Sequence, residues 1–474
     1  MKHFDLIVIG SGPAGEKGAA QAAYFGKRVA VIERETHVGG AGINTGTVPS
    51  KTLRETALYF SGLRQRGLYG IDYSLKENLN IENFMYRKKN VVENEWRIVR
   101  NNLARHNIHL INSEASLKDA HTVIARSERG EQELSADVIL IATGSSPLHP
   151  KEIPFDGKLI YDSDDILKLK KIPRTMLVVG GGVIGTEYAS IFTALGVEVT
   201  LVDPRGQVLT FIDSEIVERL TKRLETFGLR FLLNDRMTKI EALGDHVQIT
   251  LQSGGRHEFE IALIASGRES NVRGLGLEEA GVKLGNRGVV LVNEKYQTSV
   301  PNIYAAGDVI GFPALASTSM EQARVAMVHA FDLKYKERVS PALPLAVYSI
   351  PEISAVGLTE DECKEKNIAY LVGRAYYEKN ARGQIIGDTS GMIKLIFASA
   401  DKRLLGAHII GEQASELIHI AANIIVRDET IDAFIEAVYN YPTISELYKY
   451  AAYDGLDKLQ RSLQNNINDL QHSR

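Results

Sequence analysis

Short apolar runs, each followed by a glycine-rich turn and a helical stretch, recur along the chain. Residues 4–9 form an apolar run of strand length, and the glycine-rich segment 10–15 follows at once, before an alanine-rich stretch that reaches Phe25. A short apolar run that ends in a turn signal predicts a buried strand. The beginning of the chain is therefore predicted to form a strand, a tight turn and a helix, and residues from about 53 to 107 predict two further helices.

The first glycine segment has the spacing of a dinucleotide-binding turn. Gly10 permits a tight turn, Gly12 lets the backbone approach a pyrophosphate at the helix N-terminus, and Gly15 allows the helix to pack closely on the strand. Residues 28–32 predict a second strand, and Glu33 at its end lies 23 positions after Gly10, where an acid can bind ribose hydroxyls. The residues predicted to bind here are Gly10, Gly12, Pro13, Ala14, Gly15 and Glu33.

The same pattern occurs a second time, beginning at residue 174. The apolar run 174–179 leads into a second glycine turn, the run 197–202 predicts the next strand, and Asp203 again lies 23 positions after the first glycine of the turn. An internal repeat of this kind predicts two Rossmann-like units and thus an α/β fold that binds two dinucleotides. The predicted binding residues of the second unit are Gly180, Gly182, Val183, Gly185 and Asp203.

Residues 39–51 read Gly-Gly-Ala-Gly-Ile-Asn-Thr-Gly-Thr-Val-Pro-Ser-Lys. This stretch resembles the flavin-facing loop of the pyridine nucleotide-disulfide oxidoreductase family, whose pattern is Gly-Gly-x-Cys-x-Asn-x-Gly-Cys-x-Pro-Ser-Lys. Gly42 and Thr47 stand at the two cysteine positions. Because thiol–disulfide exchange needs a thiolate, we expect electrons to leave from the flavin itself. A glycine-rich surface loop without chemistry is the alternative interpretation.

The resemblance implies that the first unit binds FAD and the second binds NAD(H) or NADP(H). It also implies a catalytic pair, Lys51 and Glu187, beside the flavin, although a glutamate at this point of a helix can also be simply solvated. Residues 298–308 match the second FAD motif of the family, and residues 142–144 match its exit from the flavin domain. The further residues assigned by resemblance are Gly39, Gly40, Thr47, Thr143, Gly144, Gly307, Asp308 and Ala316 for FAD, and Gly267 for NAD(P).

The resemblance covers essentially the whole chain and divides it into three parts. We expect an FAD-binding domain at 1–150 and 270–344, an NAD(P)-binding domain at 151–269, and an α+β dimerisation domain at 345–474, hence a homodimer or higher homo-oligomer. The family's catalytic histidine is replaced by Tyr441, and tyrosine is a poor base at neutral pH. His419 lies in an apolar helical run, so we expect it to be packed or hydrogen-bonded rather than a replacement base.

Within the family the chain most resembles the transhydrogenase branch, which implies the reaction NADPH + NAD⁺ ⇌ NADP⁺ + NADH through the flavin. One nicotinamide pocket must then accept both nucleotides. Asp203 can bind the ribose hydroxyls of NAD but repels a 2′-phosphate, and Arg205 can bind that phosphate unless it is a solvated loop arginine. The alternatives are an NADH-dependent diaphorase or oxidase, and a non-catalytic flavin-bearing redox sensor or interaction protein.

Composition narrows the partners. The chain has 474 residues, of which 44% are hydrophobic and 24% charged, and its formal net charge is −4. This balance gives no long-range attraction to nucleic acid or to an anionic membrane, so we expect small-molecule partners. Cys363 is the single cysteine, which excludes an intrachain disulfide and a cysteine-based metal site, and we expect no bound metal. We also expect no membrane span, no signal peptide and a cytoplasmic location.

Overall fold

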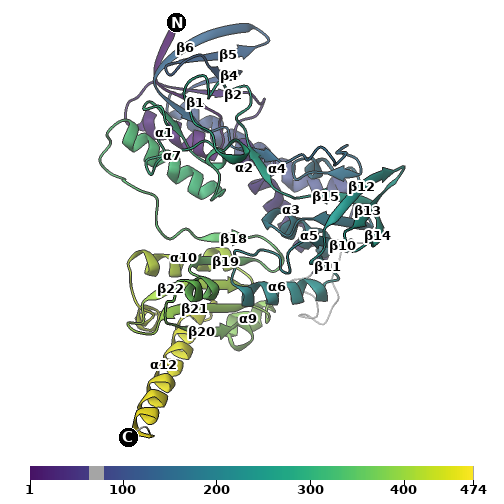
Figure 1. Ribbon diagram of the computed structural model, residues 1–474, viewed down its shortest axis with the longest axis vertical. Coiled ribbons are helices and arrows are strands. Elements are labelled where there is room, and N and C mark those ends of the chain that lie inside the picture. Colours follow the sequence, from purple (N-terminus) through teal and green to yellow (C-terminus); the bar gives the residue numbers. More distant parts are fainter. Residues whose placement is uncertain (63–78, 473–474) are drawn as a thin grey trace.

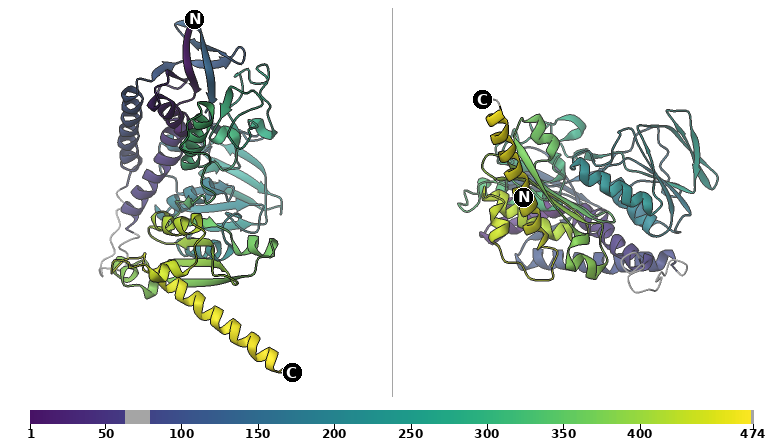
Figure 2. Two further views of the ribbon diagram at one scale, coloured as in Figure 1. Left: turned by 90° about the vertical axis from the view of Figure 1, so that its left-hand side faces the viewer. Right: turned by 90° about the horizontal axis from the view of Figure 1, so that it is seen from below.

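The computed structural model describes residues 1–62 and 79–472. The molecule is elongated, with one sheet at the N-terminal end, a second sheet beside its middle and a third sheet below (Figure 1). The C-terminal helix α12 (Leu447–His472) begins against the body, and its far end projects away from it, as the left view shows (Figure 2). Among the helices of the described residues, none is long and apolar enough to cross a membrane.

The first sheet is built around the first strand of the chain. β1 (Lys2–Ile9) lies parallel to β2 (Val29–Glu33) on one side and to β6 (Gly130–Ile141) on the other. β17 (Ile303–Ala305) also pairs in parallel with β6, so the chain returns to this sheet after it has built the second one. The sheet order is β3-β2-β1-β6-β5-β4, with β3 at His109–Asn112, β4 at Glu114–Leu117 and β5 at Thr122–Ser127.

Helices pack tightly on this first sheet. α1 (Pro13–Tyr24) lies against α7 (Ala316–Ala330). A Cβ atom at Gly18 would stand 2.5 Å from Leu140 Cδ2 and 3.3 Å from Ala323 Cβ, so glycine is needed where α1 meets both neighbours. The two helices predicted between 53 and 107 are α3 and α4, and residues 63–78 between them lie outside the described part. Their bounds, with the short α2, are α2 Gly40–Asn44, α3 Thr47–Ser61 and α4 Ile81–Arg105.

The second sheet repeats the parallel core of the first. β9 (Thr175–Val179) pairs in parallel with β10 (Glu198–Asp203), and α5 (Val183–Ala194) connects them. This arrangement matches that of β1, α1 and β2, as the internal repeat predicts. The antiparallel pair β7 (Ser145–Pro147) and β16 (Arg268–Ser270) holds the two connections between the units together. The other elements between β7 and β16 are β8 Ile160–Tyr161, β11 Arg230–Leu233, β12 Met237–Leu243, β13 His246–Leu251, β14 Arg256–Phe259, β15 Ile261–Ile264, α6 Ser214–Thr226 and η2 Asp165–Lys168. Two short helices follow β16, namely η3 Asn286–Gly288 and η4 Asp308–Ile310.

The third sheet is antiparallel, with the order β18-β19-β22-β21-β20. α10 (Ala414–Val426) packs on β22, and α12 packs on β20. This α+β unit follows two α/β units, so the expected fold class is confirmed. Its elements are β18 Leu345–Val347, β19 Ile353–Gly357, β20 Tyr370–Tyr376, β21 Met392–Ala398, β22 Leu404–Ile410, α8 Glu360–Glu365, α9 Ala381–Ile386, α11 Asp432–Glu436 and η5 Tyr377–Lys379.

A buried group of charges, which we name the ion cluster, joins the second unit to the third. Lys394 of β21 is 1% exposed, and its Nζ lies 2.7 Å from Asp213, 3.0 Å from Glu215 and 2.5 Å from Glu360. Arg374 also donates to Glu215. Burial alone would raise the pKa of Glu215, but the hydrogen bonds from Arg374 and Lys394 outweigh it and lower this pKa to about 2. The cluster therefore fixes the start of α6 against the third sheet.

Candidate functional site

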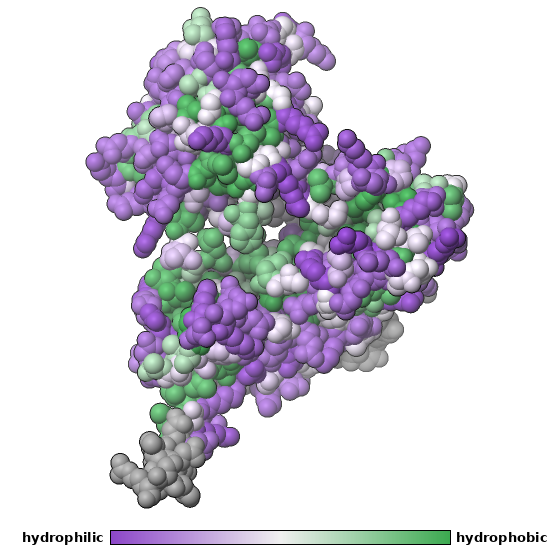
Figure 3. Space-filling model, in the orientation of Figure 1, coloured by the Kyte–Doolittle hydropathy of each residue, from purple (hydrophilic) through white to green (hydrophobic). Residues whose placement is uncertain are grey.

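A large cavity, which we name the central cavity, opens between the three units. Its volume is about 1860 Å³, and its walls come from both glycine turns, from the loop 39–51 and from the third unit. In Figure 3 the surface is largely hydrophilic, and apolar side chains gather around a hollow in the face shown. Pockets for one small ligand usually measure roughly 300–1,000 Å³. The central cavity is therefore large enough for more than one dinucleotide segment.

The first glycine turn enters this cavity at the start of α1. Gly10 has φ of +100°, and a Cβ there would lie 2.5 Å from the carbonyl oxygen of Ala142. Gly12 precedes α1, and no side chain caps the helix. The first amide groups of α1 are thus left for another acceptor, which suits the phosphate role predicted for this turn.

The Glu33 carboxylate accepts hydrogen bonds from this turn. Its Oε2 accepts hydrogen bonds from Ser11 N at 2.9 Å and Ser11 Oγ at 2.6 Å, while its Oε1 accepts from Glu35 N at 2.9 Å. The side chain is buried yet still lines the central cavity. Its location therefore agrees with the predicted ribose contact, which remains a prediction.

The second glycine turn repeats the first at the level of single contacts. Gly180 has φ of +107°, and a Cβ there would lie 2.5 Å from the carbonyl oxygen of Ala265. A Cβ on Gly185 would lie 1.8 Å from Gly180 O, just as one on Gly15 would lie 1.9 Å from Gly10 O. In both units the last glycine thus lets the helix cross directly over the turn, as the sequence spacing predicts.

Asp203 differs from Glu33 in having a basic partner. Arg205 donates Nε to Asp203 Oδ1 at 2.8 Å and Nη2 to Oδ2 at 2.7 Å, and Gly181 N also donates to Oδ2 at 2.6 Å. Burial would raise the pKa of Asp203, but the hydrogen bonds from Arg205 and Gly181 outweigh it and the pKa is lowered. Asp203 is 1% exposed, whereas the Arg205 side chain is 45% exposed. The two predicted specificity residues therefore form one ion pair.

The loop 39–51 packs against the first glycine turn, and glycines lie on both sides of this contact. Gly39 N donates to Ser11 Oγ at 3.0 Å, and a Cβ on Gly40 would lie 2.8 Å from Gly12 Cα. Gly42 lines the central cavity, where a Cβ would lie 2.9 Å from Pro13 Cγ. The backbone at this cysteine position of the family thus approaches Pro13 too closely for an added side chain, unless one of the two moves.

Lys51 and Glu187 form the ion pair that the resemblance implies. Lys51 Nζ lies 2.6 Å from Glu187 Oε2 and 2.9 Å from Oε1, and both residues line the central cavity. Lys51 comes from α3 and Glu187 from α5, so the pair joins the first unit to the second. The Glu187 side chain is only 4% exposed, which makes the lysine an essential counter-charge.

The other predicted residues divide into cavity walls and supports. Asp308 accepts a hydrogen bond from Ser145 Oγ at 3.0 Å, and Thr143 Oγ1 donates to Asn271 O at 2.7 Å. Predicted residues that line the cavity include Gly10, Gly12, Pro13, Ala14, Glu33, Gly40, Thr47, Lys51, Thr143, Gly144, Gly182, Val183, Glu187, Gly267, Gly307, Asp308 and Ala316. The predicted residues that are not among its lining residues are Gly15, Gly39, Gly180, Gly185, Asp203 and Arg205.

The expectation that His419 packs against its neighbours was wrong, whereas the expectation that it is not a replacement base stays a prediction. This residue is exposed on α10 and lines the central cavity, whereas we expected a packed or hydrogen-bonded side chain. The buried face of α10 includes Leu417, Ile418 and Ala421, and position 419 lies off that face. Tyr441 is 73% exposed and is not among the lining residues of the cavity in the single chain.

Several cavity residues carry no signal in the sequence. Tyr348 N donates to Glu187 Oε1 at 2.8 Å, and Lys51 Nζ lies 5.0 Å from the centre of the Tyr348 ring. Asp164 lies 3.8 Å from Arg268, yet burial raises the pKa of its carboxyl group. These residues are spread over distant segments of the chain, so only the fold brings them together.

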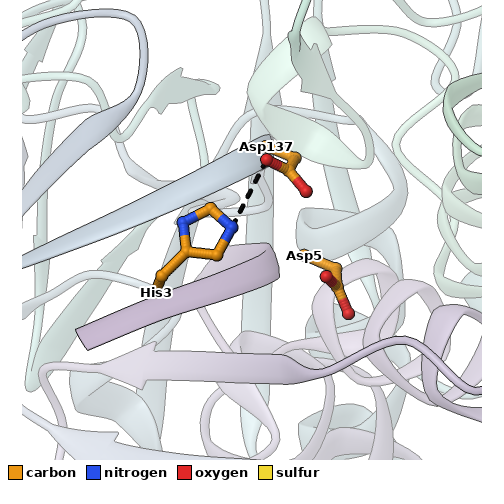
Figure 4. Close-up of side chains that lie close together, drawn as sticks. All are labelled: His3, Asp5 and Asp137. Carbon is orange, nitrogen blue, oxygen red and sulfur yellow. Dashed lines mark ion pairs between the residues drawn. The ribbon is translucent and has the colours of Figure 1, made fainter.

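A separate group of possible metal ligands lies at the far end of the first sheet. Figure 4 shows His3, Asp5 and Asp137, with His3 Nε2 3.4 Å from Asp137 Oδ1. Asp5 Oδ2 already accepts a hydrogen bond from Arg28 N at 2.5 Å, and His3 and Asp137 are exposed. Exposed acidic groups of this kind are common without an ion, so we assign no metal to them.

Comparison with known proteins agrees with this geometry. The sequence profile described as pyridine nucleotide-disulphide oxidoreductase matches residues 4–330, and the profile of its dimerisation domain matches residues 343–452. The soluble pyridine nucleotide transhydrogenase of Mycobacterium tuberculosis (strain ATCC 25177 / H37Ra) is 43% identical, over 97% of this chain and 98% of the relative. That of Colwellia psychrerythraea is 39% identical, over 96% and 98%.

Solved structures extend the similarity to the whole fold. LpdA from Mycobacterium tuberculosis superimposes with a TM-score of 0.89 at 28% identity, covering 96% of this chain and 99% of LpdA. The flavoprotein disulfide reductase RclA from Escherichia coli gives 0.84 at 27% identity, covering 94% and 98%. This chain belongs to the pyridine nucleotide-disulphide oxidoreductase family.

Proposed function

We propose that this protein is an FAD-dependent NAD(P)⁺ transhydrogenase, which transfers a hydride between NADPH and NAD⁺ through the flavin. The observation that carries the proposal is the convergence of both glycine turns and the Lys51–Glu187 pair on one cavity, beside a loop that has no thiol. The similarity to soluble pyridine nucleotide transhydrogenases over nearly the full chain supports the same activity.

FAD is the cofactor of this family, and the first unit has the features that would hold it. Gly12 leaves the start of α1 open to a pyrophosphate, and in the described part of the chain the one atom within 4 Å of a Cβ placed there is Gly40 Cα, at 3.7 Å. Glu33 and Asp308 offer carboxylates to the sugar-derived hydroxyls, and Lys51 offers a positive charge. When bound, FAD supplies a carrier that takes a hydride from one nicotinamide and returns it to another.

The nicotinamide nucleotides are assigned to the second unit. Among the residues that the structure describes, no side chain caps α5 at Gly182, and none of their atoms lies within 4 Å of a Cβ placed there. This open turn is suited to a second pyrophosphate. Val183 and Glu187 line the cavity between this turn and Lys51, which supports a nicotinamide position next to the flavin.

Reduction of disulfide substrates is disfavoured by the cavity wall. Gly42 and Thr47 replace both thiols of the family's pattern, and an added Cβ at Gly42 would meet Pro13 at 2.9 Å. Cys363 is fully buried in the third unit, where burial raises the pKa of its thiol. A disulfide substrate in the cavity would therefore meet no thiolate.

The Asp203–Arg205 pair supports acceptance of both nucleotides. A bare carboxylate at the end of this strand repels a 2′-phosphate, but Arg205 covers both oxygens of Asp203 and cancels its charge. The guanidinium remains partly exposed, so it can also donate to a phosphate. We propose that the pair lets one pocket bind NAD(H) and NADP(H) in turn.

We further propose the assembly and its compartment. The domains would span 1–150 with 270–344, 151–269 and 345–474, and the return of β17 to the first sheet supports the discontinuous first domain. The third unit matches the family's dimerisation domain and exposes Val438 by 95% and Tyr441 by 73%, which supports a homodimer. We assign this dimer to the cytoplasm.

The direct test is hydride exchange by the purified FAD-loaded protein. NADPH and the thionicotinamide analogue of NAD⁺ are mixed without oxygen, and the reduced analogue is followed by its own absorbance. We expect one reduced analogue for each NADPH oxidised. Oxidation of NADH or NADPH only in the presence of quinone or oxygen would replace the proposal with a diaphorase or oxidase. Binding of both nucleotides without any turnover would favour a redox sensor.

A further inference from the structure

Tyr348 contacts both members of the Lys51–Glu187 pair from the third unit. It lies between β18 and β19 and lines the central cavity. Its backbone N donates to Glu187 Oε1 at 2.8 Å, and its ring centre lies 5.0 Å from Lys51 Nζ. The first, second and third units therefore meet at this one ion pair.

The backbone contact fixes the carboxylate. Glu187 Oε1 accepts from Tyr348 N and from Lys51 Nζ at 2.9 Å, while Oε2 accepts from the same Nζ at 2.6 Å. Glu187 is 3% exposed, so these donors must satisfy its charge. Rotation of the carboxylate would break at least one of these bonds, and Glu187 therefore has a single orientation.

The Tyr348 ring lies near Lys51, the other member of the ion pair. The Lys51 side chain is 26% exposed, so its ammonium group has lost much of its water. An aromatic face within about 6 Å attracts a cation and replaces part of this hydration. Lys51 is thus held between the Glu187 carboxylate and the Tyr348 ring, with its charge at the cavity wall.

The segment that carries Tyr348 is itself anchored. Arg54 lies three positions after Lys51 on α3, and its Nε donates to Ser349 O at 2.9 Å. Arg54 is 4% exposed. On the other side, Ser415 of α10 donates its hydroxyl to Glu352 Oε2 at 3.0 Å, and Glu352 lies four positions after Tyr348. The segment 348–352 is therefore attached to both α3 and α10.

We propose that Tyr348 is a positioning residue that holds the Lys51 charge toward the flavin and thereby sets the rate of flavin reduction by nicotinamide nucleotides. This inference rests on the proposed role of the Lys51–Glu187 pair. It makes the third unit part of the reductive site and not only an assembly surface. Every substitution other than proline keeps the backbone N–H that donates to Glu187, so such variants test the ring alone.

The test compares Tyr348→Phe, Tyr348→Met and Tyr348→Leu in the FAD-loaded protein. Flavin reduction by NADH alone is followed by stopped-flow absorbance, and the flavin midpoint potential is measured separately. Tyr348→Phe keeps the ring and should stay within about twofold of wild type. Tyr348→Met and Tyr348→Leu remove it and should slow the limiting rate about fivefold, with a more negative potential and an unchanged NADH dissociation constant.

Two further variants separate this inference from the function on which it rests. Lys51→Met should slow reduction, and Lys51→Met combined with Tyr348→Met should be no slower than Lys51→Met alone, because the ring acts through the lysine. Additive losses in the double variant would overturn the positioning role. If flavin reduction is slow in Lys51→Met but unchanged in Tyr348→Met, the positioning role of Tyr348 fails while the role of Lys51 stands. If Lys51→Met is itself unchanged, the ion pair has no role in reduction and both proposals for it fail. Each of these measurements uses NADH alone, so they test the role of Tyr348 even if the protein does not exchange hydride between two nucleotides.

Discussion

Arg205→Glu is the sharpest test of nucleotide specificity. In the structure Arg205 covers both carboxylate oxygens of Asp203 and leaves 45% of its side chain exposed. The substitution removes the counter-charge of a buried aspartate and places a second carboxylate next to it. We expect the protein to lose affinity for NADP(H), whose 2′-phosphate would meet two negative charges, and to keep nearly all its affinity for NAD(H).

The magnitude follows from two contributions. A hydrogen bond to a charged group is worth roughly 1.5–3 kcal/mol. Repulsion between unit charges about 5 Å apart is about 1–2 kcal/mol at an effective dielectric constant of roughly 40–80, the range for so exposed a site. Salt and the mobility of the exposed side chain reduce both. We therefore expect a net loss of about 1–3 kcal/mol, or roughly 5- to 150-fold in Kd for NADP(H).

The assay is anaerobic titration of the FAD-loaded protein with each nucleotide. Arg256→Glu is a matched control, because Arg256 is an exposed arginine in β14 of the same unit. The control should leave both dissociation constants unchanged, and added salt should narrow the difference between NADP(H) and NAD(H) in Arg205→Glu. Equal losses for the two nucleotides would refute the specificity argument. If the wild-type flavin is reduced by NADH but not detectably by NADPH, the transhydrogenase proposal itself fails.

Three more predictions concern the flavin site and the ion cluster. Because Gly42 and Thr47 provide no thiols, anaerobic reductive titration should take up two electrons per FAD, and uptake of four or a thiolate charge-transfer band would contradict this. Lys51→Met should slow flavin reduction and shift the flavin potential while the circular dichroism spectrum keeps its native form, though breaking a buried pair can also cost several kcal/mol of stability; unchanged reduction kinetics would refute the assignment. The lowered pKa of Glu215, about 2, predicts that its stabilising contribution is complete above its ordinary value near 4.5 and is lost as pH falls toward 2. As pH falls from about 5 to about 2, the free energy of unfolding measured with urea should therefore decrease by up to about 3 kcal/mol less in Glu215→Gln than in wild type. An identical dependence on pH in the two proteins would contradict the cluster's role.

Local patterns predicted the two α/β units well, for a physical reason. The strand, turn and helix of each unit are neighbours in sequence, and the glycines are required by backbone contacts within the same unit, such as that of Gly15 with Gly10 O. Residue spacing alone therefore carries the information. The signal for His419 was also available: the buried positions of α10 recur with a helical period, and 419 falls outside it.

Contacts between units could not be read in the same way. Lys51 and Glu187 are 136 positions apart, and only the family resemblance paired them. Nothing in the sequence near Tyr348 indicates that its amide group reaches Glu187, because that contact depends on how the third unit docks. The ion cluster is similar, since Lys394 lies in an otherwise apolar strand and finds its acidic partners on α6 and α8.

The two copies of the internal repeat differ in the residues that follow their terminal carboxylates. Glu33 and Asp203 occupy corresponding positions, and each accepts a hydrogen bond from an amide of its own glycine turn. After Asp203 the chain places Arg205, whose guanidinium covers the carboxylate. After Glu33 the corresponding residue is Glu35, and the neighbouring Arg34 donates to Glu35 instead. Within residues 1–62 and 79–472, the hydrogen bonds of the Glu33 carboxylate therefore include no basic side chain, which suits the ribose hydroxyls proposed to bind there. Arg205 makes the second unit the better match for a 2′-phosphate, so the difference between two residues at matching positions supports our proposal that FAD binds the first repeat and NADP(H) the second.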